Sequence, residues 1–141
     1  MSRVEIGKNG KTYEEAFASF RNEVLDVLDM ERTGEKFQRE LLSKVVLWHP
    51  TGFFPVRFRT RGAALRRPGG KLDRDHVYTR RFLADQILAS ADLGEIFENA
   101  GTLCYVTPKE HVRLGLHKGK VGWDRYLAAG IKWHDLDEDL A

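Results

Sequence analysis

An acidic residue and a histidine stand side by side at Asp75 and His76, within the segment LDRDHV. An adjacent Asp and His can form a salt bridge, or can supply a metal ligand and the general base that activates a water molecule. A histidine with an unperturbed pKa of about 6.5 is largely neutral at pH 7, as a general base must be. Taken alone, each residue more often has an ordinary structural role, Asp75 as the partner of a nearby arginine.

A second histidine, His111, follows a clearly marked helix start. Residues 107–110 read T-P-K-E: a threonine cap, a proline suited to the first helical position and a glutamate that completes a capping box. Five β-prone residues, 102–106, come just before. We therefore predict a short strand followed directly by a helix, with His111 in the rigid first turn, where a metal ligand could be held in place.

Positive charge is concentrated in one window of the chain. Residues 57–81 contain nine Lys or Arg and two Asp, so this window carries +7 while the rest of the chain sums to −5. Eight of the nine are arginine, whose planar guanidinium pairs with phosphate through two hydrogen bonds. Because neutralised phosphates release counterions, we interpret the window as a nucleic-acid-binding surface with salt-dependent affinity. The candidate contacts are Arg57, Arg59, Arg61, Arg66, Arg67, Arg80 and Arg81.

The N-terminal part of the chain contains two helical segments, which would pack beneath the candidate site residues. Residues 12–15 form a T-x-x-E capping box, and apolar residues then recur at helical spacing as far as Leu28. After Gly34 the spacing resumes, and we expect it to stop at His49 and Pro50. We predict a helical hairpin over residues 1–50 whose apolar stripes are core.

Shorter elements are predicted over residues 51–141. Between residues 56 and 61 every second residue is an arginine, which would put three guanidinium groups on one face of a strand. A Pro-Gly-Gly turn then leads to a second strand ending near His76, and Thr79 is placed to cap a helix over residues 80–90. The fold class is therefore α+β, with residues 1–50 and 51–141 expected to form one compact domain.

In order and in local structure, these features resemble the HNH, or ββα-metal, endonucleases. That family has Asp-His at the end of one strand, then Asn with Leu-Cys, then a histidine on the following helix. The matching residues here are Asp75, His76, Asn99, Leu103, Cys104 and His111. The resemblance covers residues 71–117, and the segment GWDRYLAAGI at 122–131 is similar to the ending of small actinobacterial or phage proteins of this type.

The resemblance implies a metal-dependent endonuclease. Its fold would be a helical hairpin packed on a small ββα-metal core, with a helix inserted between the two strands. His76 would be the general base and Asn99 would orient its loop, while Asp75 and His111 would hold a divalent ion, Mg²⁺ in first place and otherwise Mn²⁺ or Zn²⁺. The substrate would be nucleic acid, DNA in preference to RNA. Since neighbouring strand residues alternate faces, Asp75 and His76 converge only where the strand ends or bends.

Cysteine content and hydropathy indicate the compartment. The single cysteine, Cys104, excludes an internal disulfide and suits a reducing environment. No run approaches the ~18 apolar residues of a membrane span, and the first residues lack the apolar core of a signal peptide. We expect a cytoplasmic protein of a bacterium or a phage-infected cell, with no membrane partner.

Two other functions fit the same sequence. One is a non-catalytic nucleic-acid-binding or regulatory protein on the same scaffold, which would bind in a salt-dependent but metal-independent way. The other is an interaction protein whose arginines meet an acidic protein partner. A run of charge can also be a solvated face with no binding role, and most such runs are. The C-terminal DLDEDLA, residues 135–141, would then cover the arginines or remain a solvated tail.

Overall fold

The chain folds into two compact units, each built from two separate stretches of sequence. The computed structural model describes residues 6–30 and 34–136. The first unit comprises Met1–Pro55 and Thr79–Gly101, and the second comprises Val56–Tyr78 and Thr102–Ala141. The segment between the two expected strands therefore packs with the N-terminal helices, whereas the division expected from the sequence lies between residues 50 and 51.

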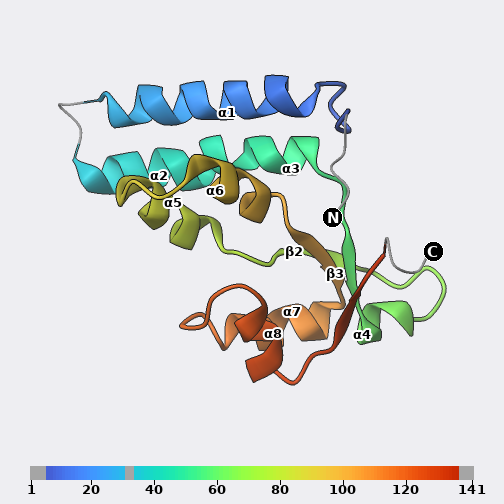
Figure 1. Cartoon of the computed structure of the whole chain (residues 1–141). Helices are drawn as coiled ribbons and strands as arrows, with labels where there is room; N and C mark the ends of the chain where they lie inside the picture. The colour runs from blue at the N-terminus through green and yellow to red at the C-terminus, as the bar shows by residue number, and fades with distance from the viewer. Residues whose placement is uncertain (1–5, 31–33, 137–141) are drawn as a thin grey trace. The chain divides into compact units, whose positions relative to one another are not determined.

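The first unit is helical (Figure 1). Its elements are α1 (Tyr13–Leu28), α2 (Glu35–Lys44), a 3₁₀ turn η1 (Val46–Trp48), α3 (His49–Phe53), α5 (Arg80–Leu88) and α6 (Leu93–Ala100). Phe20, Phe53 and Phe97 are fully buried at its centre. The ring of Phe97 lies 5.3 Å from that of Phe20 and 6.0 Å from that of Phe53, centroid to centroid. Aromatic burial of this kind supplies most of the stability of a small helical unit.

In this unit the start of the first helix agrees with the prediction from the sequence, but the predicted end of the second helix does not. The capping box at Thr12 and Glu15 is present as predicted, and it starts α1. The expected stop at His49 and Pro50 is wrong: α2 ends at Lys44 with Val45 as its C-cap, and α3 begins at His49 with Pro50 in its first turn. Proline lacks a backbone N–H and therefore fits the first turn of a helix as readily as the residues after its end.

Two helices, not one, lie between the second and third strands. Thr79 caps α5 as predicted, its hydroxyl accepting from the backbone N–H of Phe82. At Ser90, two residues after the end of α5, the backbone takes a positive φ of 62°, which is not helical. The Asp92 carboxylate then accepts hydrogen bonds from the N–H groups of Gly94 and Glu95 and caps the start of α6. Aspartate is a favoured N-cap residue, so this second helix start could be recognised from the sequence.

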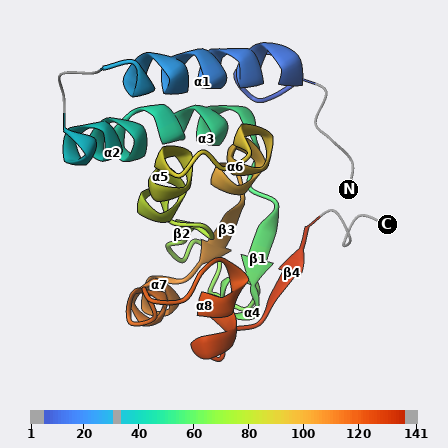
Figure 2. The same ribbon diagram turned by 60° about the vertical axis from the view of Figure 1, so that its left-hand side comes forward.

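The second unit is a small mixed sheet with short helices (Figure 2). Its elements are β1 (Phe58–Thr60), α4 (Arg61–Ala64), β2 (Asp73–His76), β3 (Leu103–Val106), α7 (Pro108–Gly115), α8 (Trp123–Ala128) and β4 (Trp133–Asp135). The strand order is β2-β3-β1-β4. Strands β1 and β3 are parallel, and both outer strands pair antiparallel with their neighbours. The α+β class is therefore confirmed. Strands β2 and β3 pair antiparallel although α5 and α6 separate them in sequence, and α7 follows β3 directly.

The core of the second unit lies between the sheet and α7 and α8. Val77, Cys104, Leu114 and Tyr126 are fully buried there. Trp123 of α8 stacks on Trp133 of β4, with ring centroids 4.4 Å apart and planes 7° apart. Over the described part of the chain, no helix is both long and apolar enough to cross a membrane.

Candidate functional site

The two faces of the sheet carry opposite charge. Directly paired strand residues share a face, so the pairings Asp75 with Cys104, Cys104 with Phe58 and Phe58 with Asp135 define one face. We call this the acidic face; its charged strand residues are Asp73, Asp75 and Asp135. The opposite face, which we call the basic face, carries Arg59, Arg74, His76 and His134 together with Tyr105. The candidate site lies where α7 and α8 cover the acidic face.

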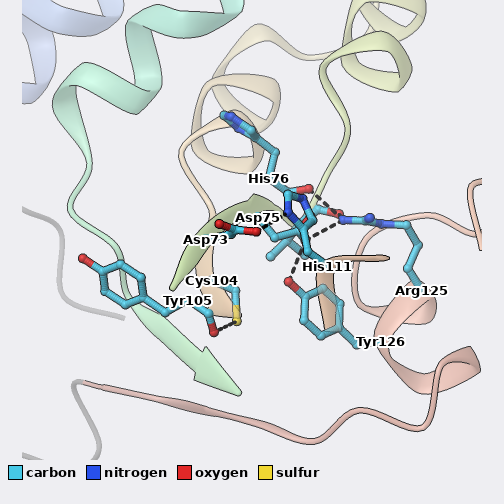
Figure 3. Close-up of polar contacts among 9 residues, drawn as sticks. Asp73, Asp75, His76, Cys104, Tyr105, His111, Arg125 and Tyr126 are labelled. Atoms are coloured by element: carbon cyan, nitrogen blue, oxygen red, sulfur yellow. Dashed lines mark hydrogen bonds and ion pairs between the residues drawn. The ribbon is translucent and has the colours of Figure 1, made fainter. Parts of the chain in front are cut away.

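Asp75 is buried and held by two side chains of α8. Only 4% of its surface is exposed. Its Oδ2 accepts from Nη2 of Arg125 at 2.8 Å and from the hydroxyl of Tyr126 at 2.6 Å. The same Nη2 also donates to the backbone carbonyls of His76 and Val77, so Arg125 fixes the end of β2 (Figure 3). A buried charge is tolerated only with such pairing.

His111 lies between two aspartates of β2. Its Nδ1 is 3.1 Å from Oδ2 of Asp73, and its Nε2 is 3.6 Å from Oδ1 of Asp75. The His111 side chain is 45% exposed, that of Asp73 25% and that of Asp75 5%, so the cluster opens to solvent on the histidine side. The structure thus brings together Asp75 and His111, the two residues assigned to the metal.

Local sequence explains why His111 is held there. Thr107 caps α7 and forms a capping box with Glu110, as predicted. The Glu110 carboxylate is buried and also accepts from the hydroxyl of Thr60, at 2.6 Å, which ties the first turn of α7 to β1. A Cβ at Gly62 would lie 2.6 Å from Glu110 Oε2, so a larger residue there would displace this carboxylate from its hydrogen bonds.

His76 is not brought to this cluster. It belongs to the basic face, because it is adjacent to Asp75 in a regular strand and pairs with Leu103. Figure 3 shows its side chain extending away from His111 and Tyr126. The bend that would let Asp75 and His76 converge is absent from β2, whose pairing with β3 is regular through His76.

Asn99 does not open a strand. It lies in the last turn of α6, within the first unit, and β3 begins at Leu103. The cap at Asp92 and the apolar spacing of the residues after it make this segment helical. Asn99 and His76 therefore belong to different units of the chain.

The predicted arginine stripe is divided in the structure. Arg57 forms two hydrogen bonds through Nε with Asp135, at 2.9 and 3.1 Å, and lies over the ring of Phe58. Asp135 is the first residue of the acidic segment 135–141, and the rest of its acidic residues lie within 137–141, outside the described chain. Arg59 contacts Nε2 of His134 at 3.3 Å on the basic face. The expected strand is shorter, because α4 begins at Arg61.

The other candidate arginines lie at three different places. Arg61, Arg66 and Arg67 are exposed in α4 and the loop after it, where Arg66 donates to the carbonyls of Ala63 and Gly70. In the first unit, Arg80 stacks over Trp48, 4.1 Å from the ring centroid, and donates to the carbonyl of Ser43. Arg81 is exposed in the first turn of α5. Burial lowers the pKa of Arg80, which has a structural role here.

Burial also perturbs two groups beneath the site. Burial, with the nearby Asp75 charge as a smaller cause, raises the pKa of the Cys104 thiol to about 12. The same two causes raise the pKa of the Tyr126 hydroxyl far above its ordinary value. Both groups therefore stay protonated at neutral pH, and Tyr126 serves Asp75 as a hydrogen-bond donor.

Three site residues were missed by the sequence reasoning. Asp73 shares a face with Asp75 by strand alternation, and that signal was present in the sequence. Arg125 and Tyr126 lie within the segment GWDRYLAAGI, but nothing in their spacing indicates a partner about fifty residues earlier. Over the described residues there is no group of three or more His, Cys, Asp or Glu side chains arranged to hold a metal ion.

The donor chemistry nevertheless suits an ion with two protein ligands. Oδ1 of Asp75 and Nε2 of His111 face each other, and neither atom has a closer polar partner among the hydrogen bonds described above. The Asp73 carboxylate lies within hydrogen-bonding distance of the other ring nitrogen, Nδ1, and a carboxylate in that position orients a metal-binding histidine. Mg²⁺ commonly takes one or two protein ligands and keeps its waters.

Comparisons with protein-family models, curated proteins and solved structures gave no match for this chain.

Proposed function

We propose that the protein is a metal-dependent endonuclease of the ββα-metal type, with its centre at Asp75 and His111. The observation that supports this most is the 3.6 Å approach of Asp75 Oδ1 to His111 Nε2 across a strand–strand–helix segment. A carboxylate on the first strand facing a histidine in the first turn of the helix after the second strand is the arrangement that the resemblance implies. The basic residues of the second unit suit a phosphodiester substrate.

Each residue of the centre has a distinct task in this proposal. In the tautomer that carries its proton on Nδ1, His111 donates a hydrogen bond to Asp73, and Nε2 is left as a ligand atom turned toward Asp75. Arg125 and Tyr126 hold Oδ2 of Asp75, so that Oδ1 is the oxygen presented to the ion. A divalent ion bound there would stabilise charge on the phosphoryl oxygens and lower the pKa of a bound water. His76 has no task on this face, and the general base is therefore not assigned to it.

A non-catalytic nucleic-acid-binding protein on the same scaffold is the second candidate. Two observations favour it: Asp75 is almost fully buried and already neutralised by Arg125, and His76 extends away from the cluster. Such a protein would bind nucleic acid equally well with and without divalent metal.

Cleavage of plasmid DNA and of a single-stranded oligonucleotide, with Mg²⁺, Mn²⁺ or Zn²⁺ and with EDTA, separates the two candidates. We expect metal-dependent cleavage that His111→Gln lowers by about 10²-fold or more. This variant suits the test because the His111 side chain is 45% exposed and its loss leaves no buried charge unpaired.

Two matched histidine substitutions serve as controls. His117→Gln, just beyond α7, and His76→Gln, on the basic face, should keep most of the cleavage activity. No cleavage with any of the metals, or full activity in His111→Gln, would refute the proposed centre. Loss of activity in His76→Gln alone would return the general base to His76.

A further inference from the structure

All the charged residues of the four strands are sorted by sign between the two faces of the sheet. Asp73, Asp75 and Asp135 lie on the acidic face, and Arg59 and Arg74 lie on the basic face with two histidines. None of the described strand residues on the basic face carries a carboxylate side chain. A polyanion approaching the basic face therefore meets no strand carboxylate.

Four residues of the basic face form one row that crosses every strand. The pairings are Arg74 with Tyr105, Tyr105 with Arg59, and Arg59 with His134. An aromatic ring on a central strand therefore lies between two arginines. Neighbouring strands are about 4.8 Å apart, which puts the two arginine positions about 10 Å apart.

The side chains of this row are accessible in different degrees. Arg74 is exposed, and Tyr105, Arg59 and His134 are partly exposed. The contact between Arg59 and His134 Nε2 holds the guanidinium within the row. Figure 3 shows the ring of Tyr105 extending away from the buried pair of Asp75 and Tyr126. The tyrosine therefore belongs to a surface distinct from the candidate metal centre.

We propose that this row binds single-stranded nucleic acid, with a base stacked on Tyr105 and phosphates paired to Arg74 and Arg59. Only an unpaired base can place its flat face on a tyrosine ring, whereas the bases of a duplex are stacked on one another. Stacking on an aromatic ring between basic residues is independent of sequence, because every base has a flat face. The inference rests on the proposed function for the kind of substrate and adds the strand state that is bound.

The row also reaches the candidate centre along the sheet. Arg74 lies on β2, the outer strand that carries Asp73 and Asp75 on its other face. A strand of nucleic acid that follows the row from β4 leaves the sheet at β2, the strand whose Asp73 and Asp75 contact the partly exposed His111. The basic face would thus hold the substrate, and the edge at β2 would deliver it to the acidic face.

Fluorescence anisotropy with labelled dT20 and with a 20-base-pair duplex, in EDTA, tests this inference on the full chain. We expect dT20 to bind more tightly than the duplex. Tyr105→Ala should weaken dT20 binding about tenfold, and Tyr105→Phe should stay within about twofold because the ring is kept. Arg74→Gln should weaken binding and flatten the slope of log K against log salt by about 0.7, the value for one phosphate of a single strand.

Arg21→Gln provides the matched control, since Arg21 is an exposed arginine on α1 of the first unit. It should leave both the affinity and the salt slope unchanged. Thermal melting followed by circular dichroism identifies any variant that is not folded; Tyr105→Phe and Arg74→Gln, which remove no buried group, keep the test valid if Tyr105→Ala fails to fold. Tighter binding of the duplex, or equal effects of Arg74→Gln and Arg21→Gln, would overturn the inference.

The same measurements separate this inference from the nuclease proposal. Binding of dT20 that depends on Arg74 and Tyr105, without cleavage in any metal, would refute the nuclease and leave the binding surface standing. Cleavage that depends on His111, with unchanged dT20 affinity in Arg74→Gln and Tyr105→Ala, would refute the binding surface alone.

Discussion

The two units bury different kinds of side chain. In the first unit the centre is aromatic, with Phe20, Phe53 and Phe97 fully buried. Among the described residues, every buried charged side chain belongs to the second unit: Asp75, Glu110, Arg125 and Asp135. Each of the four has a hydrogen-bonded partner. Apolar packing tolerates small shifts, whereas a buried ion pair requires defined geometry, so the second unit is the one built to hold side chains in fixed positions.

Removal of the Asp75 carboxylate should produce the largest loss of stability. Asp75→Ala leaves the guanidinium of Arg125 buried without its counter-ion, and this costs about 3–5 kcal/mol of unfolding free energy. Urea denaturation measures the loss.

Asp73→Ala is the matched control, because it removes the same side chain two residues earlier on the same face. The Asp73 side chain is 25% exposed and pairs with the more exposed His111, so its loss should cost less than about 1 kcal/mol. Equal effects of the two substitutions would mean that the buried pair with Arg125 does not stabilise the second unit as proposed.

Local signals predicted most of the elements that carry the site. The capping boxes at Thr12 and Thr107 and the cap at Thr79 each involve residues three apart, so the sequence contains the whole interaction. The fold class and the strand at residues 73–76 followed from short-range pattern in the same way.

Long-range partners could not be predicted in this way. The contact between Asp75 and Arg125 joins residues fifty positions apart, and only the folded chain brings β2 and α8 together. The placement of His76 was predictable from strand alternation, but the resemblance gave it a role on the same face as Asp75. The helical segment at Asn99 depended on the cap at Asp92, which is a local signal that was not used.

Alkaline pH should weaken the second unit through Cys104, the only cysteine of the chain. Burial raises the pKa of its thiol from 9.0 to about 12. Since the folded-state pKa is the higher one, this contribution to stability is complete below pH 9 and is lost as the pH rises from 9 to about 12. The expected slope is up to about 1.4 kcal/mol of unfolding free energy for each pH unit in that window.

Urea denaturation across this pH range, on wild type and Cys104→Ala, isolates the thiol. The variant starts from a lower stability, because a buried side chain is truncated, but its unfolding free energy should fall less steeply above pH 9. Other groups that titrate in alkali are common to both proteins, except that Cys104 itself contributes to the raised pKa of Tyr126. Parallel curves would show that the thiol is not held protonated in the folded second unit.

The smallest expected effect on the unfolding free energy comes from the capping box, a motif that occurs once in each unit. Thr12 and Thr107 both begin capping boxes, but the Thr12 box is exposed and the Glu110 carboxylate of the Thr107 box is buried against Thr60. Thr12→Ala should cost about 0.5–1 kcal/mol and Thr107→Ala about 1–2 kcal/mol, because the latter leaves a backbone N–H of a partly buried helix start without its acceptor. Urea denaturation of both variants, with Thr→Ser at each position as a control that keeps the hydroxyl, measures this difference. If Thr12→Ala costs as much as Thr107→Ala, the partly buried capping box of the second unit stabilises the fold no more than the exposed one of the first unit. The two units would then differ in stability only through their apolar cores.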